Sequence, residues 1–108
     1  MRIDSITQFI SKFKDHGRRK EVIECFTQGC CYWFAIILYE RFSSLKSPAD
    51  IMYDPIDCHF GCRINGVVYD ITGVVTESYK WEYWEDYAHI DPAEANRVRK
   101  YCILKENV

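Results

Sequence analysis

The chain has 108 residues, of which 48% are hydrophobic and 16% aromatic. This composition is ample for one self-supporting core, so we expect a single domain over residues 1–108. The net charge of -2 comes from 14 basic and 16 acidic residues, and the only basic run, Arg18–Lys20, is followed at once by Glu21. The charge balance therefore argues against nucleic acid as a partner.

The sequence also bears on the compartment. Residues 1–5 contain no apolar core of signal-peptide length, and no segment approaches the roughly 20 apolar residues of a transmembrane helix. We therefore expect a cytoplasmic protein without membrane contacts, with export by a route that needs no standard signal as the alternative. In a reducing compartment the six cysteines should be free thiols, with a disulfide framework as the alternative. They are Cys25, Cys30, Cys31, Cys58, Cys62 and Cys102.

The N-terminal part predicts an amphipathic helix over about residues 4–16. Asp4 or Ser5 can cap its start, and Gly17 can end it. The pattern from residue 18 to residue 26 is mixed and predicts a short second helix. The apolar positions of the first helix are Ile3, Ile6, Phe9, Ile10 and Phe13, and those of the second are Val22, Ile23 and Phe26.

A central helix is predicted where apolar residues continue without interruption from Cys30 to Tyr39. A segment that is apolar all round belongs in the middle of a core, and this one should run to about Phe42. Residues 43–48 have the composition of a loop. Residues 51–53 are β-prone and predict a short strand, for which an edge position is one option.

The clearest local structure lies between Cys58 and Thr72, where Asn65 and Gly66 join two β-prone runs. This dipeptide suits a two-residue type I′ hairpin turn. The residues that flank the turn, Ile64 and Val67, then face each other, and the rest of the register follows.

This register gives the hairpin two different faces. His59 and Asp70 share one face as diagonal neighbours, a separation that longer side chains can bridge. Gly61, opposite Asp70, leaves room there. The other face is apolar and should lie on the central helix. It consists of Phe60, Cys62, Ile64, Val67, Tyr69 and Ile71.

The remaining elements are less regular. Residues 78–87 are aromatic and acidic without a clean period, which fits an irregular strand or a segment wrapped over the core. A helix is predicted from Asp91, its N-cap, to about Tyr101, with Pro92 in the first turn and Glu94 placed for a capping box. Residues 102–104 fit an edge strand or simple packing. The expected fold is α+β: a central buried helix packed against a small antiparallel sheet, with N-terminal and C-terminal helices.

Three residues in this arrangement suggest a catalytic site. A thiol attacks acyl carbons efficiently only as the thiolate, and a helix start, where Cys31 is expected, favours that form. His59 would act as general base and then as general acid, and Asp70 would orient its ring. The amide of Cys31 and the side chain of Gln28 are candidate oxyanion donors. Such a site needs no cofactor.

The same residues resemble a known group of enzymes. Gly29-Cys30-Cys31-Tyr32-Trp33-Phe34-Ala35 is similar to the Gly-x-Cys-x-x-Phe-Ala helix start of compact papain-like folds, the transglutaminase-like and NlpC/P60-like cysteine hydrolases. Cys58-His59-Phe60 resembles their His strand, and Gly66-Val67-Val68-Tyr69-Asp70-Ile71-Thr72-Gly73 resembles their Tyr-Asp-x-x-Gly strand. The resemblance covers roughly residues 25–73. Matching on Gly-x-Cys assigns the nucleophile to Cys31, with Cys30 in the variable position.

Each of these residues also has a purely structural alternative. Cys31 can be a small buried thiol, His59 a core histidine, and Asp70 the acceptor of a turn amide. Trp81 and Trp84 would either cover the core or line a substrate groove, as would their neighbour Tyr83. A zinc site is the main chemical rival, because Cys58, His59 and Cys62 are close in sequence. On a strand, however, the two cysteines point to the face opposite His59.

Two functions follow from the sequence. The first is a small thiol hydrolase that acts on an amide or peptide bond, as a peptidase, a deamidase or an acyl transferase. The second is a catalytically silent protein-binding module of the same fold, such as an inhibitor or accessory protein encoded by a phage or another mobile element. The expected partner is accordingly a peptide or protein.

Overall fold

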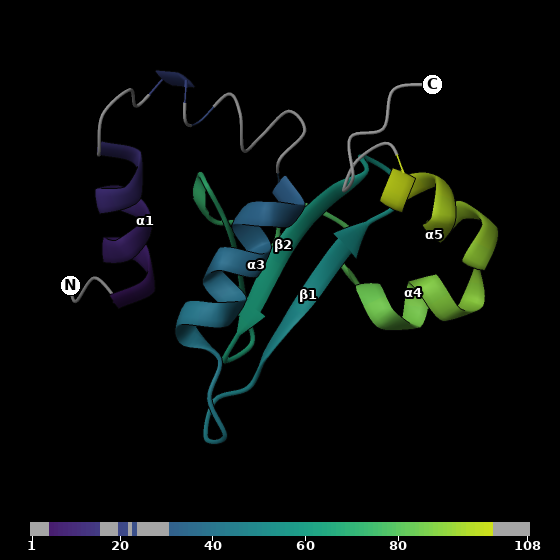
Figure 1. Cartoon of the computed structure of the whole chain (residues 1–108). Coiled ribbons are helices and arrows are strands. Elements are labelled where there is room, and N and C mark those ends of the chain that lie inside the picture. Colours follow the sequence, from purple (N-terminus) through teal and green to yellow (C-terminus); the bar gives the residue numbers. More distant parts are fainter. Residues whose placement is uncertain (1–4, 16–19, 22, 24–30, 101–108) are drawn as a thin grey trace.

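The computed structural model describes residues 5–15, 20, 21, 23 and 31–100, which form the expected α+β fold (Figure 1). The helices are α1 (Ser5–Asp15), α3 (Cys31–Phe42), α4 (Trp84–Ile90) and α5 (Pro92–Val98). The strands are β1 (Ala49–Asp54), β2 (His59–Ile64), β3 (Val67–Asp70), β4 (Gly73–Val74) and β5 (Glu82–Tyr83). They form one antiparallel sheet in the order β4-β3-β2-β1-β5.

Helix α3 lies on one face of this sheet, which we call the inner face, and α1 stands beside α3 (Figure 1). The contact between the two helices is aromatic: Phe13 packs edge-on against Phe34 at 5.1 Å, and Phe9 against Phe42 at 5.6 Å between ring centroids. Helices α4 and α5 pack against each other beside β1, at the end of the molecule away from α1 (Figure 1). The expectation of a central helix on a small antiparallel sheet, flanked by helices from both ends of the chain, is confirmed.

Helix α3 is buried along one side only, so the expectation that it is enclosed all round is wrong. Its Cys31, Phe34 and Leu38 belong to the core, whereas Trp33 and Tyr39 are 43% and 40% exposed. The reason is that, among the described elements, α3 packs between the sheet and α1, which together leave part of its circumference uncovered. At 12 residues it is also short, and none of the described helices could cross a membrane.

The hairpin of β2 and β3 has the predicted register. Cys62 pairs with Tyr69, Arg63 with Val68, and Ile64 with Val67. Asn65 and Gly66 adopt positive φ values of 52° and 79°, as a type I′ turn requires. The predicted apolar face does lie against α3 in the main core, where its residues are Phe60, Cys62, Ile64, Val67, Tyr69 and Ile71.

The outer face of the sheet carries a second, smaller apolar cluster. Met52, Val68 and Val75 are buried there beneath Tyr79 and Trp81. The segment after β4 therefore wraps over the outer face, which is one of the two alternatives predicted for residues 78–87.

Gly61 makes this wrapping possible. A Cβ atom at this position would lie 2.8 Å from Cγ1 of Val68 and 3.0 Å from the Trp81 ring. The space that the sequence predicted beside Gly61 is thus taken by the indole of Trp81.

Strand β1 is longer than predicted and is not an edge strand. It pairs with β2 along its whole length, from Ala49 to Asp54, and Met52 and Tyr53 also pair with β5. The short β5 lies within residues 78–87, for which an irregular strand was the other predicted alternative, and it forms by pairing with the distant β1.

Helix α4 was not predicted. Trp84 and Tyr87 pack on Tyr53 at 5.1 Å, one turn apart on the same helix face. This i, i+3 spacing was the available signal, but neighbouring aromatic residues obscured it. Helix α5 begins as predicted, since the Asp91 carboxylate accepts the Glu94 amide.

The described residues include parts of two further predicted helices, one between residues 18 and 26 and one after Asp91. The side chain of Glu94 pairs with Arg97 instead of closing a capping box, and α5 ends at Val98. Lys20, Glu21 and Ile23 are helical, in agreement with a helix in that region. The predictions for Asp4, Gly17, Gln28, Cys30 and residues 102–104 fall outside the described residues.

Replacing Gly61 by alanine should destabilise the protein, because the added methyl group collides with Val68 and with the indole above it. We expect a loss of about 1–3 kcal/mol in unfolding free energy, measured by urea titration. Val68→Ala removes the nearest colliding atom, so Gly61→Ala should cost less in that background. An equal cost in both backgrounds would contradict this explanation.

Candidate active site

Cys31 is the first residue of α3, and its side chain is buried, with 7% of the residue exposed. Burial by itself would raise the pKa of the thiol. Hydrogen bonds from the His59 ring and from the backbone amides of Phe60 and Tyr32, together with the positive charge of His59, outweigh burial and lower the pKa. The surroundings of this sulfur therefore favour the thiolate.

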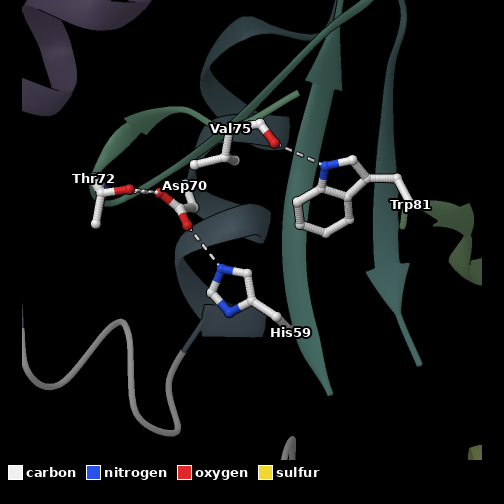
Figure 2. Close-up of polar contacts among 5 residues, drawn as sticks. All are labelled: His59, Asp70, Thr72, Val75 and Trp81. Atoms are coloured by element: carbon white, nitrogen blue, oxygen red, sulfur yellow. Dashed lines mark hydrogen bonds and ion pairs between the residues drawn. The ribbon is translucent and has the colours of Figure 1, made fainter. Parts of the chain in front are cut away.

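His59 is the first residue of β2, and its ring lies between the other two groups. Its Nε2 is 2.7 Å from Oδ2 of Asp70 (Figure 2). Burial opposes the charged form of the ring, but the hydrogen bonds with Asp70 and Cys31 and the two negative charges raise the pKa of His59 to about 9. The imidazolium is thus favoured at neutral pH.

Asp70 ends β3 and is held by a short local turn. Its Oδ1 accepts the backbone amide of Thr72 at 2.7 Å and also the Thr72 hydroxyl (Figure 2). Burial would raise the pKa of this carboxyl group, but the hydrogen bonds from His59 and Thr72 lower it. One oxygen is therefore fixed by the turn and the other is aimed at the imidazole.

The structure brings together all three residues that the sequence selected. Cys31, His59 and Asp70 form a chain from the helix start to the end of β3, and all three are buried. A thiolate, an imidazolium and a carboxylate in this order are the groups required for acyl transfer.

The aromatic residues divide between the two faces of the sheet. The Trp81 ring is 5.9 Å from that of His59, and its Nε1 donates to the carbonyl of Val75 at 3.0 Å (Figure 2). Trp84 instead packs against Phe60 on the inner face, in the main core. The structure thus places Trp81 beside the site and does not bring Trp84 to it.

Sequence reasoning missed two residues of the site. Tyr79 stacks on the His59 ring, with 4.6 Å between centroids and 28° between ring planes. Thr72 holds Asp70 through both its amide and its hydroxyl. Thr72 had a visible signal, because an aspartate followed two residues later by threonine is a common local turn. Tyr79 had none, since its contact depends on how the segment after β4 folds back.

Comparison with known protein families identifies the family of this chain. A family described as phage YunG-like protein matches residues 6–106. The chain belongs to the phage YunG-like protein family. No curated protein and no solved structure matches it.

The family description names no activity, so the chemistry of the site follows from its residues. Within residues 5–15 and 31–100 no group of three or more His, Cys, Asp or Glu side chains is arranged to hold a metal ion. Cys31, Cys58 and Cys62 are free thiols, as predicted for them. The pKa of Cys62 is raised to about 12 by burial and by the charge of Asp50, whereas the pKa of Cys31 is lowered.

Asp70→Asn should lower the pKa of His59 from about 9 toward its ordinary value, because the carboxylate that stabilises the imidazolium is lost. The ring-proton NMR shifts of His59, followed against pH in both proteins, measure this change. The ring of His89, which is exposed on α4, serves as an internal control whose NMR signals should be the same in the two proteins at each pH. A His59 titration that is the same in both proteins would contradict the ion pair.

Asp70 should also contribute to stability in a pH-dependent way. Because its pKa is lowered in the folded protein, its contribution is complete above about pH 4 and is lost as pH falls through the lowered value. The difference in unfolding free energy between wild type and Asp70→Asn should therefore shrink below about pH 4. Urea titrations over a pH series measure it, and a constant difference would contradict this account.

Proposed function

We propose that this protein is a small thiol hydrolase of the compact papain-like type that acts on an amide or peptide bond. The observation that carries the proposal is the buried contact between the Cys31 thiol and the His59 ring, whose Nε2 is 2.7 Å from Oδ2 of Asp70. The pKa of Cys31 is lowered while that of its neighbour His59 is raised to about 9. A thiolate and an imidazolium side by side provide a nucleophile and a proton donor at neutral pH.

The proposed reaction proceeds in two stages. In the first, Cys31 Sγ forms a bond to the carbonyl carbon, and the C–N bond breaks as His59 gives its proton to the leaving amine. In the second, His59 takes a proton from water, the hydroxide attacks the thioester, and the carboxylic acid leaves. The Cys31 thiolate and the His59 imidazolium are then restored. An amine in place of water would give acyl transfer.

The remaining site residues have supporting roles. Asp70 keeps the imidazole oriented, with Nε2 toward the carboxylate and the other nitrogen available to the sulfur. The amide of Cys31 is the proposed donor to the oxyanion, together with Gln28, which lies outside the described residues. Trp81 is the proposed substrate contact on the outer face. Trp84 is buried in the main core, so it is not part of this proposal.

Selective alkylation tests the proposal. At about pH 6, iodoacetamide should modify Cys31 faster than any other cysteine, and His59→Ala should slow this reaction ten-fold or more. An unperturbed thiol with a pKa of about 8.5 is only roughly 0.3% thiolate at that pH. Peptide mapping by mass spectrometry after timed quenching gives the rate at each cysteine.

Two controls make the result specific. His89→Ala removes an exposed imidazole away from the site and should leave the rate at Cys31 unchanged. Cys62, which has no exposed surface and a raised pKa, should remain unmodified. Equal and slow modification of Cys31 in wild type and in His59→Ala would reject the hydrolase.

A second function is favoured by one observation. Only 7% of Cys31, 6% of His59 and 4% of Asp70 is exposed, which is little surface for a substrate to reach. A protein-binding module that keeps the fold without catalysis would bury the same polar cluster as a structural element. In that case iodoacetamide should modify all of the described cysteines slowly. Membership of a phage protein family fits an inhibitor or accessory protein of this kind.

A further inference from the structure

Tyr79 lies between the candidate active site and a cavity on the outer face of the sheet, which we call the outer cavity. The outer cavity has a volume of about 640 Å³, and its apolar lining includes Met52, Val68 and Trp81. Tyr79 also lines it, whereas Cys31, His59 and Asp70 do not. The Tyr79 ring stacks on the His59 ring, with 4.6 Å between centroids. The side chain of Tyr79 therefore separates the outer cavity from the reacting groups.

The outer cavity leads toward the site at this point. Tyr79 and Trp81 both line it, and both rings approach the ring of His59. Tyr79 is the nearer of the two, at 4.6 Å between ring centroids against 5.9 Å for Trp81. Because the three reacting groups are buried, a substrate in the outer cavity reaches them once the Tyr79 ring has moved aside.

The segment that carries Tyr79 is tied down on both sides of this residue. Before it, the amide of Val75 donates to the carbonyl of Val68 at 2.8 Å, and the hydroxyl of Thr76 accepts the Val68 amide at 3.0 Å. After it, Nε1 of Trp81 donates to the carbonyl of Val75 at 3.0 Å. The backbone around Tyr79 is therefore held in place, and its side chain is the part that can rotate aside.

The stacking contact suits a charged imidazole. The planes of the Tyr79 and His59 rings are 28° apart, so the negative face of the phenol lies against the imidazole. The charged groups that act on His59 are Asp70 on β3 and Cys31 on α3. The pKa of the Tyr79 hydroxyl is raised by burial and then by four negative charges, those of Asp70, Asp57, Asp54 and Cys31. The phenol therefore stays neutral at neutral pH, and its face adds to the stability of the imidazolium.

We propose that Tyr79 is a positioning residue for His59 and that its ring limits the size of the acyl groups that reach Cys31. With the ring in place, the charged imidazole is held between Asp70 and Cys31. With the ring rotated aside, the outer cavity opens onto His59, and an apolar acyl group lies over Trp81. This inference rests on the proposed function for the acyl group, whereas the positioning of His59 does not need it.

Removing the aromatic face tests the positioning of His59. In Tyr79→Leu an apolar side chain still covers the imidazole, but the stacked ring is lost, so the pKa of His59 should fall from about 9 by about 0.5 or more. Tyr79→Phe keeps the stacked ring and should restore the wild-type titration. The control is Tyr39→Leu, at an exposed tyrosine on α3, which should titrate as wild type does. Ring-proton NMR shifts followed against pH measure these values.

Two alkylating reagents of different size test access to Cys31. Iodoacetamide and iodoacetanilide carry the same reactive group, and the second adds a phenyl ring. Relative to its rate with glutathione, the smaller reagent should be favoured about ten-fold at Cys31 in wild type, and about two-fold or less in Tyr79→Ala. Tyr79→Phe and Tyr39→Ala should keep the wild-type preference.

Cys62 reports whether each variant remains folded. It has no exposed surface, so neither reagent should modify it in a folded protein. If it becomes reactive in Tyr79→Ala, Tyr79→Leu takes the place of that variant, because leucine is also smaller than tyrosine and keeps more of the apolar packing.

The role of Tyr79 and the proposed catalysis can fail separately. If Tyr79→Leu titrates as wild type does, or if Tyr79→Ala keeps the wild-type preference for the smaller reagent, the inference is overturned. The hydrolase still stands in that case if His59→Ala slows the alkylation of Cys31. If both Tyr79 variants behave as expected while His59→Ala leaves the alkylation of Cys31 unchanged, Tyr79 positions and covers the His59 ring, and the hydrolase is rejected.

Discussion

The register of the hairpin between β2 and β3 is the constraint on which the rest of the site depends. Asn65 and Gly66 turn the chain so that Cys62 faces Tyr69, and this pairing sends Phe60 into the core and His59 to the outer face. Side chains alternate along a strand, so a slip of one residue would exchange the two faces. The core that α3 completes and the ion pair with Asp70 would both be lost.

The site forms because two elements begin at the same place. Cys31 starts α3 on the inner face, and His59 starts β2, where Cys31 can interact with the ring and with the amide of Phe60. Three ionisable groups are buried there, which is unfavourable in isolation. The hydrogen bonds from Thr72 to Asp70 and the contacts among the three groups offset that cost.

Cys31 and Cys62 show how strongly location decides the chemistry of a thiol. Both are buried, yet the pKa is lowered at Cys31 and raised to about 12 at Cys62. The difference comes from the neighbours: an imidazolium and two amides for the first, apolar packing and the charge of Asp50 for the second.

The sequence by itself determined the hairpin, its two faces, the N-cap Asp91 and the diagonal pair of His59 and Asp70, because turn chemistry and strand alternation are local properties. Only the tertiary structure decided that β1 lies inside the sheet, that residues 84–90 form a helix, that Trp84 packs in the core and that Tyr79 covers His59. These features depend on which distant surfaces meet. Neighbouring aromatic residues such as Tyr83 and Trp84 satisfy several local patterns equally well, and long-range packing selects one of them.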